Sequence, residues 1–278
     1  MGLVRSGSLV RCSKAYDPQA LGHRVRLALF ANGWVGWQIS QALTQEDEIV
    51  ALVVHPEKRA TFRNEIVAAC SLNPQNILEG DSLRSPKVAA HMKSLHPEIG
   101  VSANFGYILK PELFESFPHG CINIHSGYLP FNRGANPNVW SIVDETPAGV
   151  TIHYIDEGID TGDVIMRQQV NIEPTDTGGS LYEKLQQASI DLFARAWPLI
   201  RMGAAPRIPQ DPGSGTFHLQ ADLTSLDEIE LEQGLKARRL LNIVRARTFP
   251  GYPGATFTVN GRQVSLEVAL RYVSDEDG

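Results

Sequence analysis

The chain has 278 residues, of which 42% are hydrophobic, and 25 Lys and Arg stand against 31 Asp and Glu, for a net charge of −6 at pH 7. A chain of this length can bury one large core, so we expect one main domain with a smaller appendage. The acidic balance argues against broad, nonspecific binding to nucleic acid.

Cysteine usage and hydropathy narrow the class further. The cysteines Cys12, Cys70 and Cys121 form no spaced cluster, which argues against a disulfide framework and a zinc site, and we expect no metal. No apolar run is long enough to cross a bilayer, and residues 1–24 lack a secretory signal. We therefore predict a cytoplasmic protein without a membrane partner, and interpret residues 1–24 as an N-terminal extension.

Strand and helix signals then alternate. The hydrophobic patterns predict strands at residues 25–30, 49–54, 77–78 and 99–105, and helices at residues 34–43, 59–70 and 87–95. This alternation predicts an α/β domain over residues 25–206 with a doubly wound, mostly parallel sheet. Ligands of such sheets bind beyond the carboxyl ends of the strands, which is where His125 and the segment after Phe105 are expected.

The C-terminal part has a different pattern. Residues 181–192 predict a helix that packs on the sheet, and the Pro- and Gly-rich residues 206–216 predict a linker. Residues 226–244 are then expected to be helical, and residues 255–259 and 264–268 form strands about Asn260-Gly261, a two-residue hairpin signature. We expect residues 217–273 to form a small α+β appendage.

Two segments carry the candidate chemistry. Near the end of a buried strand, Asn123 and His125 stand two residues apart and therefore on one face. A carboxamide donor and an imidazole can together hold an oxygen on which negative charge develops. The loop between strands at residues 150–155 and 164–170 can add the carboxylate of Asp160, with Gly158 allowing a tight turn. Alternation does not decide which face His153 takes, and we expect a core or surface role for it.

Each of these residues also has an ordinary structural interpretation. Asn123 could be a hydrogen-bonded turn residue, His125 a core histidine, and Asp160 a cap for the following turn. The occurrence of all three within two motifs favours catalysis, because a motif gains weight from matching context.

The pattern Asn-x-His-x-x-x-Leu-Pro at residues 123–130, followed by Gly-x-Asp-x-Gly at residues 158–162, resembles the formyltransferases that use N10-formyltetrahydrofolate. The resemblance extends over residues 25–206 and more weakly into the C-terminal part. It implies a Rossmann-like core and an Asn-His-Asp triad. In that triad Asn123 would donate to the formyl oxygen, His125 would stabilise the oxyanion, and Asp160 would orient His125 and help to move protons through water.

The same resemblance implies a folate site. Backbone groups in the first of two segments would read the pterin, with the second segment opposite. The first segment is Phe105, Gly106, Tyr107, Ile108 and Leu109, and the second is Asp156, Glu157, Gly158 and Ile159. The side chains of Phe105, Ile108 and Leu109 could equally be ordinary core residues, in which case the backbone contacts would remain.

The loop at residues 128–140 is the best evidence on the amine substrate. Asn136 and Pro137 are expected as N-cap and first residue of a helix. The cationic side chain in this loop could clamp a phosphate or pyrophosphate, or could form a structural ion pair, and aromatic side chains could cover a sugar or base. The expected substrate-binding residues are Tyr128, Phe131, Asn132, Arg133 and Trp140.

The loop resembles the sugar-nucleotide N-formyltransferases more than other branches of the family, since tRNA-directed relatives have a larger C-terminal domain. The expected acceptor is the amine of a nucleotide-linked deoxyamino sugar, dTDP-linked rather than UDP-linked, of the kind found in lipopolysaccharide O-antigen. We expect a homodimer through the C-terminal part and no nucleic-acid partner. The alternatives are a methionyl-tRNA formyltransferase, a formyltetrahydrofolate hydrolase and a noncatalytic folate-binding module.

Overall fold

The structure is a computed structural model that describes residues 24–211 and 213–273, so nearly all of the expected N-terminal extension lies outside the described residues. The first half alternates strands and helices as expected. Its elements are β1 (Arg26–Ala31), α1 (Gly33–Glu46), β2 (Glu48–Val54), η1 (Glu57–Arg59), α2 (Arg63–Cys70), η2 (Pro74–Asn76), β3 (Ile77–Glu79), η3 (Gly80–Arg84), α3 (Pro86–Ser94), β4 (Ile99–Ala103), α4 (Pro111–Phe114) and β5 (Cys121–His125).

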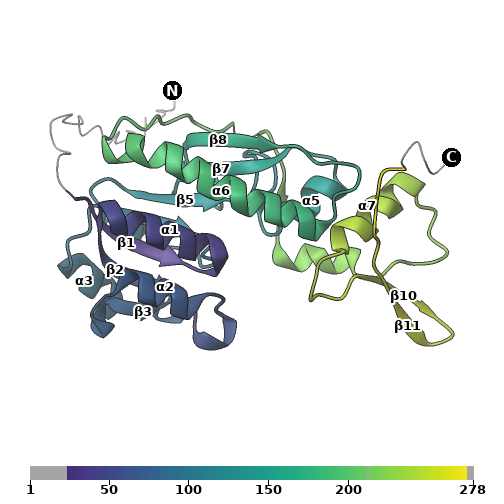
Figure 1. Cartoon of the computed structure of the whole chain (residues 1–278), viewed down its shortest axis with the longest axis horizontal. Coiled ribbons are helices and arrows are strands. Elements are labelled where there is room, and N and C mark those ends of the chain that lie inside the picture. The colour runs from purple at the N-terminus through teal and green to yellow at the C-terminus, as the bar shows by residue number, and fades with distance from the viewer. Residues whose placement is uncertain (1–23, 212, 274–278) are drawn as a thin grey trace, which may run out of the picture.

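The second half completes the main sheet and adds the C-terminal part. Its elements are β6 (Arg133–Gly134), α5 (Pro137–Val143), β7 (Ala148–Tyr154), β8 (Val164–Val170), α6 (Gly178–Arg201), β9 (Phe217–His218), η4 (Gln220–Leu226), α7 (Ala237–Arg247), β10 (Ala255–Val259) and β11 (Arg262–Leu266). In Figure 1, α6 lies along the main sheet, and α7 and the β10/β11 hairpin lie together at one end of the molecule.

Seven strands form the central sheet in the order β3-β2-β1-β4-β5-β7-β8. Pairings from β3 to β5 are parallel, whereas β7 and β8 are antiparallel to their neighbours. This confirms the prediction of a doubly wound, mostly parallel sheet. The antiparallel β7 also brings the loop that follows it back beside β5, which places that loop next to the candidate chemistry.

Both faces of the sheet are covered by apolar side chains. Leu27 and Leu29 of β1 pack in one buried cluster with α1, α5 and α6, while Ala28 and Phe30 pack in a second cluster with α3 and α4. Alternate side chains of a strand point to opposite faces, so a strand buried on both faces must be apolar throughout. This explains the continuous apolar runs in the sequence.

Two predicted helices are shorter than expected. The helix predicted at residues 59–70 begins at Arg63, because Phe62 has a left-handed backbone with φ of 57°. The helix predicted at residues 226–244 begins only at Ala237. Residues 227–229 instead pair with β10, through Ile229 N–H to Thr256 O at 2.7 Å and Thr256 N–H to Asp227 O at 2.7 Å. Tertiary pairing overrides the local helical preference there.

The predicted hairpin is confirmed. β10 and β11 pair antiparallel about Asn260-Gly261, and both turn residues have positive φ, 50° and 71°. An Asn-Gly pair suits such a turn because these residues tolerate that backbone region. Among the described residues, no helix combines the length and apolar character that a bilayer span requires.

Candidate active site

The site is built on two neighbouring antiparallel strands. Asn123 and His125 stand on β5, and β7 places His153 directly opposite Asn123. Opposite residues of an antiparallel pair point to the same face of the sheet. His153 therefore joins the candidate site, which corrects the core or surface role expected from the sequence. The cross-strand register decides its face, and no periodicity within β7 could have revealed that register.

Asp160 brings the site together. Its Oδ1 lies 3.3 Å from both Asn123 Nδ2 and His153 Nε2, and its Oδ2 lies 3.4 Å from His125 Nδ1. The backbone N–H of Gly134 donates to Oδ2 at 2.9 Å. The structure thus brings together all three residues of the expected triad, and adds His153 and a backbone donor around the same carboxylate.

The loop that carries Asp160 depends on close backbone packing. Asp160 itself has a left-handed φ of 54°, whereas Gly158, which was expected to make the turn, has no positive φ. Gly158 is required for a different reason, because a Cβ there would collide with Thr161 Oγ1. The Asp156 carboxylate closes the turn by accepting from Gly158 N–H at 3.1 Å and from Thr161 Oγ1 at 2.6 Å.

Two backbone carbonyls determine where the imidazoles carry protons. His125 Nε2 lies 2.9 Å from Asn132 O, and His153 Nδ1 lies 2.8 Å from Tyr154 O. A carbonyl only accepts, so these nitrogens must donate. The second nitrogen of each ring faces Asp160. A proton that arrives on either of these nitrogens is therefore placed beside a carboxylate oxygen.

The carboxylate of Asp160 is held in its ionised form. Burial by itself raises the pKa of Asp160, but the adjacent His125 and His153 and the N–H of Gly134 outweigh burial and hold this pKa well below its usual range. An ionised carboxylate only accepts, so Asn123 must turn its amide nitrogen toward it. His153 Nε2 also lies 3.3 Å from that nitrogen, but when it carries a proton toward Asp160 it is a donor, so Asn123 keeps its second amide hydrogen for a substrate oxygen.

The expected folate wall divides into buried and exposed parts. Phe105 and Leu109 are core residues in the second apolar cluster, as the ordinary interpretation held, but Ile108 is 76% exposed. Tyr107 packs against Phe105 with ring centroids 5.1 Å apart. Ile155, which begins the segment leading to the Asp160 loop, packs on the same cluster. Both expected folate segments therefore begin at residues that pack on the same apolar cluster.

Two of the expected substrate contacts need correction. Asn132 is completely buried and donates its amide hydrogens to Ser141 Oγ at 2.9 Å and Thr146 Oγ1 at 2.8 Å, so its side chain holds the loop. Trp140 is only 5% exposed, and its ring stacks on His218 with centroids 4.0 Å apart. Neither side chain is available to a ligand on this surface. Asn136 occupies the predicted cap position of α5 but makes no side-chain cap hydrogen bond.

Arg133 and Tyr128 are more accessible. Arg133 is half-buried, and among the described residues its guanidinium has no hydrogen bond or ion pair, with Nε shielded from solvent. A half-exposed guanidinium that no described carboxylate occupies is free to bind an anionic ligand, which favours that interpretation over the structural ion pair. The ring of Tyr128 lies under the guanidinium of Arg167, 4.8 Å from its centroid. Within the part of the chain described, no cluster of His, Cys, Asp and Glu could hold a metal ion.

This geometry agrees with the relationships of the chain. The profile of the family described as formyl transferase matches residues 26–197, and that of the N-formyltransferase dimerization C-terminal domain matches residues 222–272. The chain belongs to the formyl transferase family, and it is a formyltransferase with a C-terminal domain of the dimerization type.

Curated relatives and solved structures point to different acceptors. The chain is 30% identical over 227 residues to the methionyl-tRNA formyltransferase of Syntrophus aciditrophicus (strain SB), a match that covers 80% of this chain and 71% of that protein. A sugar N-formyltransferase from Shewanella sp FDAARGOS_354 superposes with a TM-score of 0.76 over 91% of this chain and 100% of that chain, at 23% identity, which shows the shared fold.

A third relative is 31% identical and was solved with ligands. It is the formyltransferase PseJ from Anoxybacillus kamchatkensis in complex with UDP-4,6-dideoxy-4-formamido-L-AltNAc and tetrahydrofolate. The TM-score is 0.53, and the match covers 72% of this chain and 88% of that chain. The three relatives agree on formyl transfer and leave the acceptor to be argued from this chain.

The depressed pKa of Asp160 predicts a pH-dependent stability. The folded pKa lies below the value of about 3.9 of an unfolded chain, so the ionised carboxylate stabilises the fold above that pH, and the stabilisation is lost as pH falls through the folded pKa. We expect the difference in unfolding free energy between wild type and Asp160→Asn to be largest above about pH 5 and to shrink below about pH 4. Urea unfolding across this range measures it. A difference that does not change with pH would contradict the prediction.

Proposed function

We propose that this formyltransferase moves a formyl group from N10-formyltetrahydrofolate to the amine of a nucleotide-linked deoxyamino sugar, dTDP-linked in preference to UDP-linked. The observation that carries formyl transfer is the cluster of Asn123, His125 and His153 around the ionised Asp160. The solved relative that holds a UDP-linked formamido sugar together with tetrahydrofolate supports a folate as the formyl donor and a nucleotide sugar as the acceptor.

The proposed reaction is a direct transfer. The acceptor nitrogen forms a bond to the formyl carbon, the bond from that carbon to N10 of the folate breaks, and one proton moves from the acceptor amine to N10. The tetrahedral intermediate carries an oxyanion, which Asn123 and His125 would stabilise from one face of β5, with His125 turning a ring N–H toward it from Asn132 O or Asp160. Asp160 stays ionised, compensates positive charge on the imidazoles and can pass the proton through water.

The folate would bind between residues 105–109 and residues 156–159, two segments that begin beside the same apolar cluster. Ile108 is 76% exposed and Ile159 is 38% exposed, and each extends from one of these segments. Ile159 directly precedes Asp160, and large apolar side chains left exposed in this way fit a pocket that covers a flat ring system. Backbone groups of residues 105–109 and 156–159 would supply the hydrogen bonds that read the pterin edge.

The choice of a nucleotide-linked acceptor rests on Arg133. This residue directly precedes Gly134, whose N–H binds Asp160, so its backbone is anchored at the catalytic cluster. A guanidinium matches the geometry of phosphate oxygens, and here no described carboxylate competes for it. The diphosphate of a nucleotide sugar is therefore the proposed partner of Arg133, with Tyr128 and Phe131 in the same loop covering the sugar or base.

Methionyl-tRNA is the second candidate acceptor, because curated relatives at about 30% identity carry that name. The C-terminal part argues against it. Three arginines of α7 are engaged within the molecule: Arg239 with Asp144, Arg245 with the carbonyls of Glu173, Pro174 and Asp176, and Arg247 with Asp227, while Arg238 forms only an exposed pair with Glu145. A phosphate backbone is normally bound by cations that are free to contact it.

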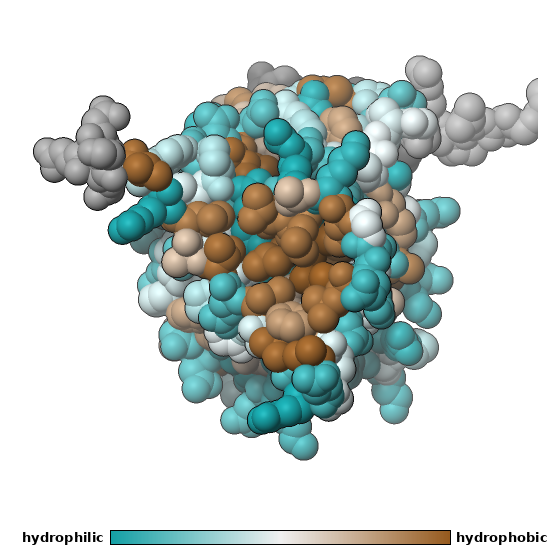
Figure 2. Space-filling model, turned by 90° about the vertical axis from the view of Figure 1, so that its right-hand side faces the viewer, coloured by the Kyte–Doolittle hydropathy of each residue, from teal (hydrophilic) through white to brown (hydrophobic). Residues whose placement is uncertain are grey.

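We also propose a homodimer through the C-terminal part. Figure 2 shows a broad apolar patch on the face of the molecule where α7 and the β10/β11 hairpin lie. Exposed apolar side chains of this part include Leu231, Leu240, Leu241, Val259 and Val264. An apolar patch of this kind marks an interface, and a C-terminal domain of the dimerization type makes a second copy of the chain the expected partner.

The first test is formyl transfer from N10-formyltetrahydrofolate to a panel of dTDP- and UDP-linked amino sugars, charged initiator tRNA, and no acceptor. We expect turnover with a sugar nucleotide, and a loss of about 10²- to 10³-fold in kcat for Asn123→Ala, since it removes a transition-state donor. Asn64→Ala, on the exposed side of α2, is the control. Turnover only with tRNA, or formate release without an acceptor, would reject the proposed substrate.

Arg133→Ala tests the diphosphate contact. We expect the dissociation constant of the nucleotide sugar to rise about 10- to 100-fold, because a charge-assisted contact is lost, while the affinity for folate stays unchanged. Isothermal titration with each ligand separates the two effects. Arg84→Ala, an exposed arginine without a described partner, is the control. Equal loss of affinity for both ligands would assign Arg133 a structural role.

Leu241→Glu tests the dimer. Leu241 is 56% exposed on α7, and a buried carboxylate at an interface without a partner is unfavourable, so we expect the variant to sediment as a monomer where the wild type sediments as a dimer. Met202 directly follows the C-terminal end of α6 and is an apolar side chain that is 49% exposed. Met202→Glu, outside the C-terminal part, should leave the dimer intact. A monomeric wild type at all concentrations would refute the proposed homodimer.

A further inference from the structure

The polypeptide between the catalytic sheet and the C-terminal part crosses the candidate site. We name residues 208–211 and 213–218 the crossing segment. It begins with a two-way backbone bridge between Ile208 and Val164 of β8, at 2.8 and 3.0 Å, and ends as β9, which pairs with β6. The sequence predicted a linker through residue 216, but its contacts show a more specific arrangement.

Gln210 contacts the loop that carries Asp160. Its Nε2 donates to Asp160 O at 3.0 Å and to Gly162 O at 2.8 Å, so both amide hydrogens hold this loop. The first of these carbonyls belongs to the residue whose φ is 54°. A left-handed backbone is unfavourable for a non-glycine residue and persists only where its surroundings determine it. Gln210 supplies two of the contacts that do so.

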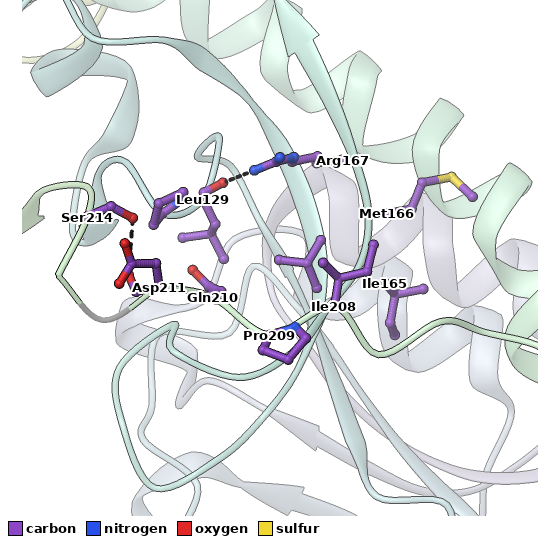
Figure 3. A pocket seen from close by; sticks show the side chains of 11 residues that line it. Leu129, Ile165, Met166, Arg167, Ile208, Pro209, Gln210, Asp211 and Ser214 are labelled. Atoms are coloured by element: carbon purple, nitrogen blue, oxygen red, sulfur yellow. Dashed lines mark hydrogen bonds between the residues drawn. The ribbon is translucent and has the colours of Figure 1, made fainter.

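Within the described chain, residues 208–211 are tied to other segments by few hydrogen bonds, namely the bridge at Ile208 and those of Gln210. Figure 3 shows a cavity between Ile208, Pro209, Gln210 and Asp211 on one side and Leu129 with the β8 side chains on the other. The cavity measures about 280 Å³, and none of the residues that line it belongs to the triad. Beside this cavity, the hydrogen bonds of Gln210 and the bridge at Ile208 fix where the segment lies relative to Asp160.

Thr216 contacts the other side of the site. Its Oγ1 accepts from the backbone N–H of Asn132 at 2.8 Å and donates to Asn132 Oδ1 at 3.0 Å. Its own carbonyl accepts from Arg133 N–H at 3.0 Å. Asn132 has a φ of 56° and presents the carbonyl that accepts from His125 Nε2 at 2.9 Å. Thr216 therefore holds the residue that orients the His125 ring.

β9 completes the connection. It pairs with β6 through the registers Arg133 to Phe217 and Gly134 to His218. Gly134 has a φ of 88°, and a Cβ there would collide with His218 O, so β6 and β9 are in direct backbone contact. This pairing aims the Gly134 N–H at Asp160 Oδ2. The crossing segment thus contacts Asn132, which binds His125, and Gly134, which binds Asp160.

We infer that Gln210 and Thr216 are positioning residues for formyl transfer. Gln210 holds the loop that carries Asp160, and Thr216 holds Asn132, whose carbonyl orients His125. The crossing segment thereby sets the distance between the imidazole of His125 and the carboxylate of Asp160. Neither side chain touches the reacting atoms. Displacements of about 1 Å in a catalytic group can cost on the order of 10²-fold in rate, so fixing these two supports has a catalytic consequence. The inference rests on formyl transfer, not on which amine accepts the formyl group.

The test uses near-isosteric variants of the full chain. Gln210→Met removes both N–H donors, Thr216→Val removes the hydroxyl, and Thr216→Ser retains it. We expect kcat to fall about 10- to 100-fold in Gln210→Met and Thr216→Val, with KM for both substrates within about twofold of wild type. Thr216→Ser should recover most of the rate. Ser214→Ala removes a hydroxyl from the same segment that donates only to Asp211 O and should have wild-type kcat.

Two further measurements separate positioning from loss of fold. Thermal unfolding should show folded protein at the assay temperature for every variant. The ring-nitrogen NMR signals of His125, assigned by comparison with His125→Gln, should report a proton on Nε2 in wild type and Ser214→Ala, and should change in Thr216→Val. Wild-type kcat in both Gln210→Met and Thr216→Val, or unchanged His125 signals in Thr216→Val, would overturn the inference. If the wild type formylates no acceptor, the proposed function fails, while the NMR signals still test the positioning.

Discussion

The site depends on one buried negative charge. Placing an ionised carboxylate in the interior is costly unless hydrogen bonds and opposite charges compensate it. Asp160 receives this compensation from Asn123 and His125 on β5, His153 on β7 and the Gly134 N–H of β6. These contributors come from three separate stretches of chain, so the carboxylate can be accommodated only when the sheet, the loop and β6 are all in place. The same contacts arrange the catalytic groups.

The topology of the sheet explains why these stretches meet. β5 is the last parallel strand, and the antiparallel β7 beside it aligns His153 with Asn123 and returns the following loop to the same face. The parallel strands β1 and β2 are buried on both faces by separate apolar clusters and supply no residue of the catalytic cluster. Function is concentrated where the parallel pattern ends.

The corrections to the sequence predictions share a physical cause. Asn132 lies in the loop before α5 and Trp140 lies in α5, a segment whose composition suits ligand binding. Asn132 instead hydrogen-bonds Ser141 and Thr146, and Trp140 stacks on His218, a residue far away in the sequence. The helix predicted at residues 226–244 is shortened because residues near 228 pair with β10. In each case a partner distant in sequence competes with the local preference and prevails, and local patterns contain no information about that partner.

The sequence by itself determined the alternating α/β core, the common face of Asn123 and His125, the Asn260-Gly261 hairpin and the pairing of two motifs that indicated formyl transfer, because periodicity and turn chemistry are properties of neighbouring residues. Only the tertiary structure decided the face of His153, the left-handed backbone of Asp160, the unpaired state of Arg133 and the route of the crossing segment. These features depend on register and on contacts between segments that are tens of residues apart, where burial and charge compensation, rather than local conformation, select the arrangement.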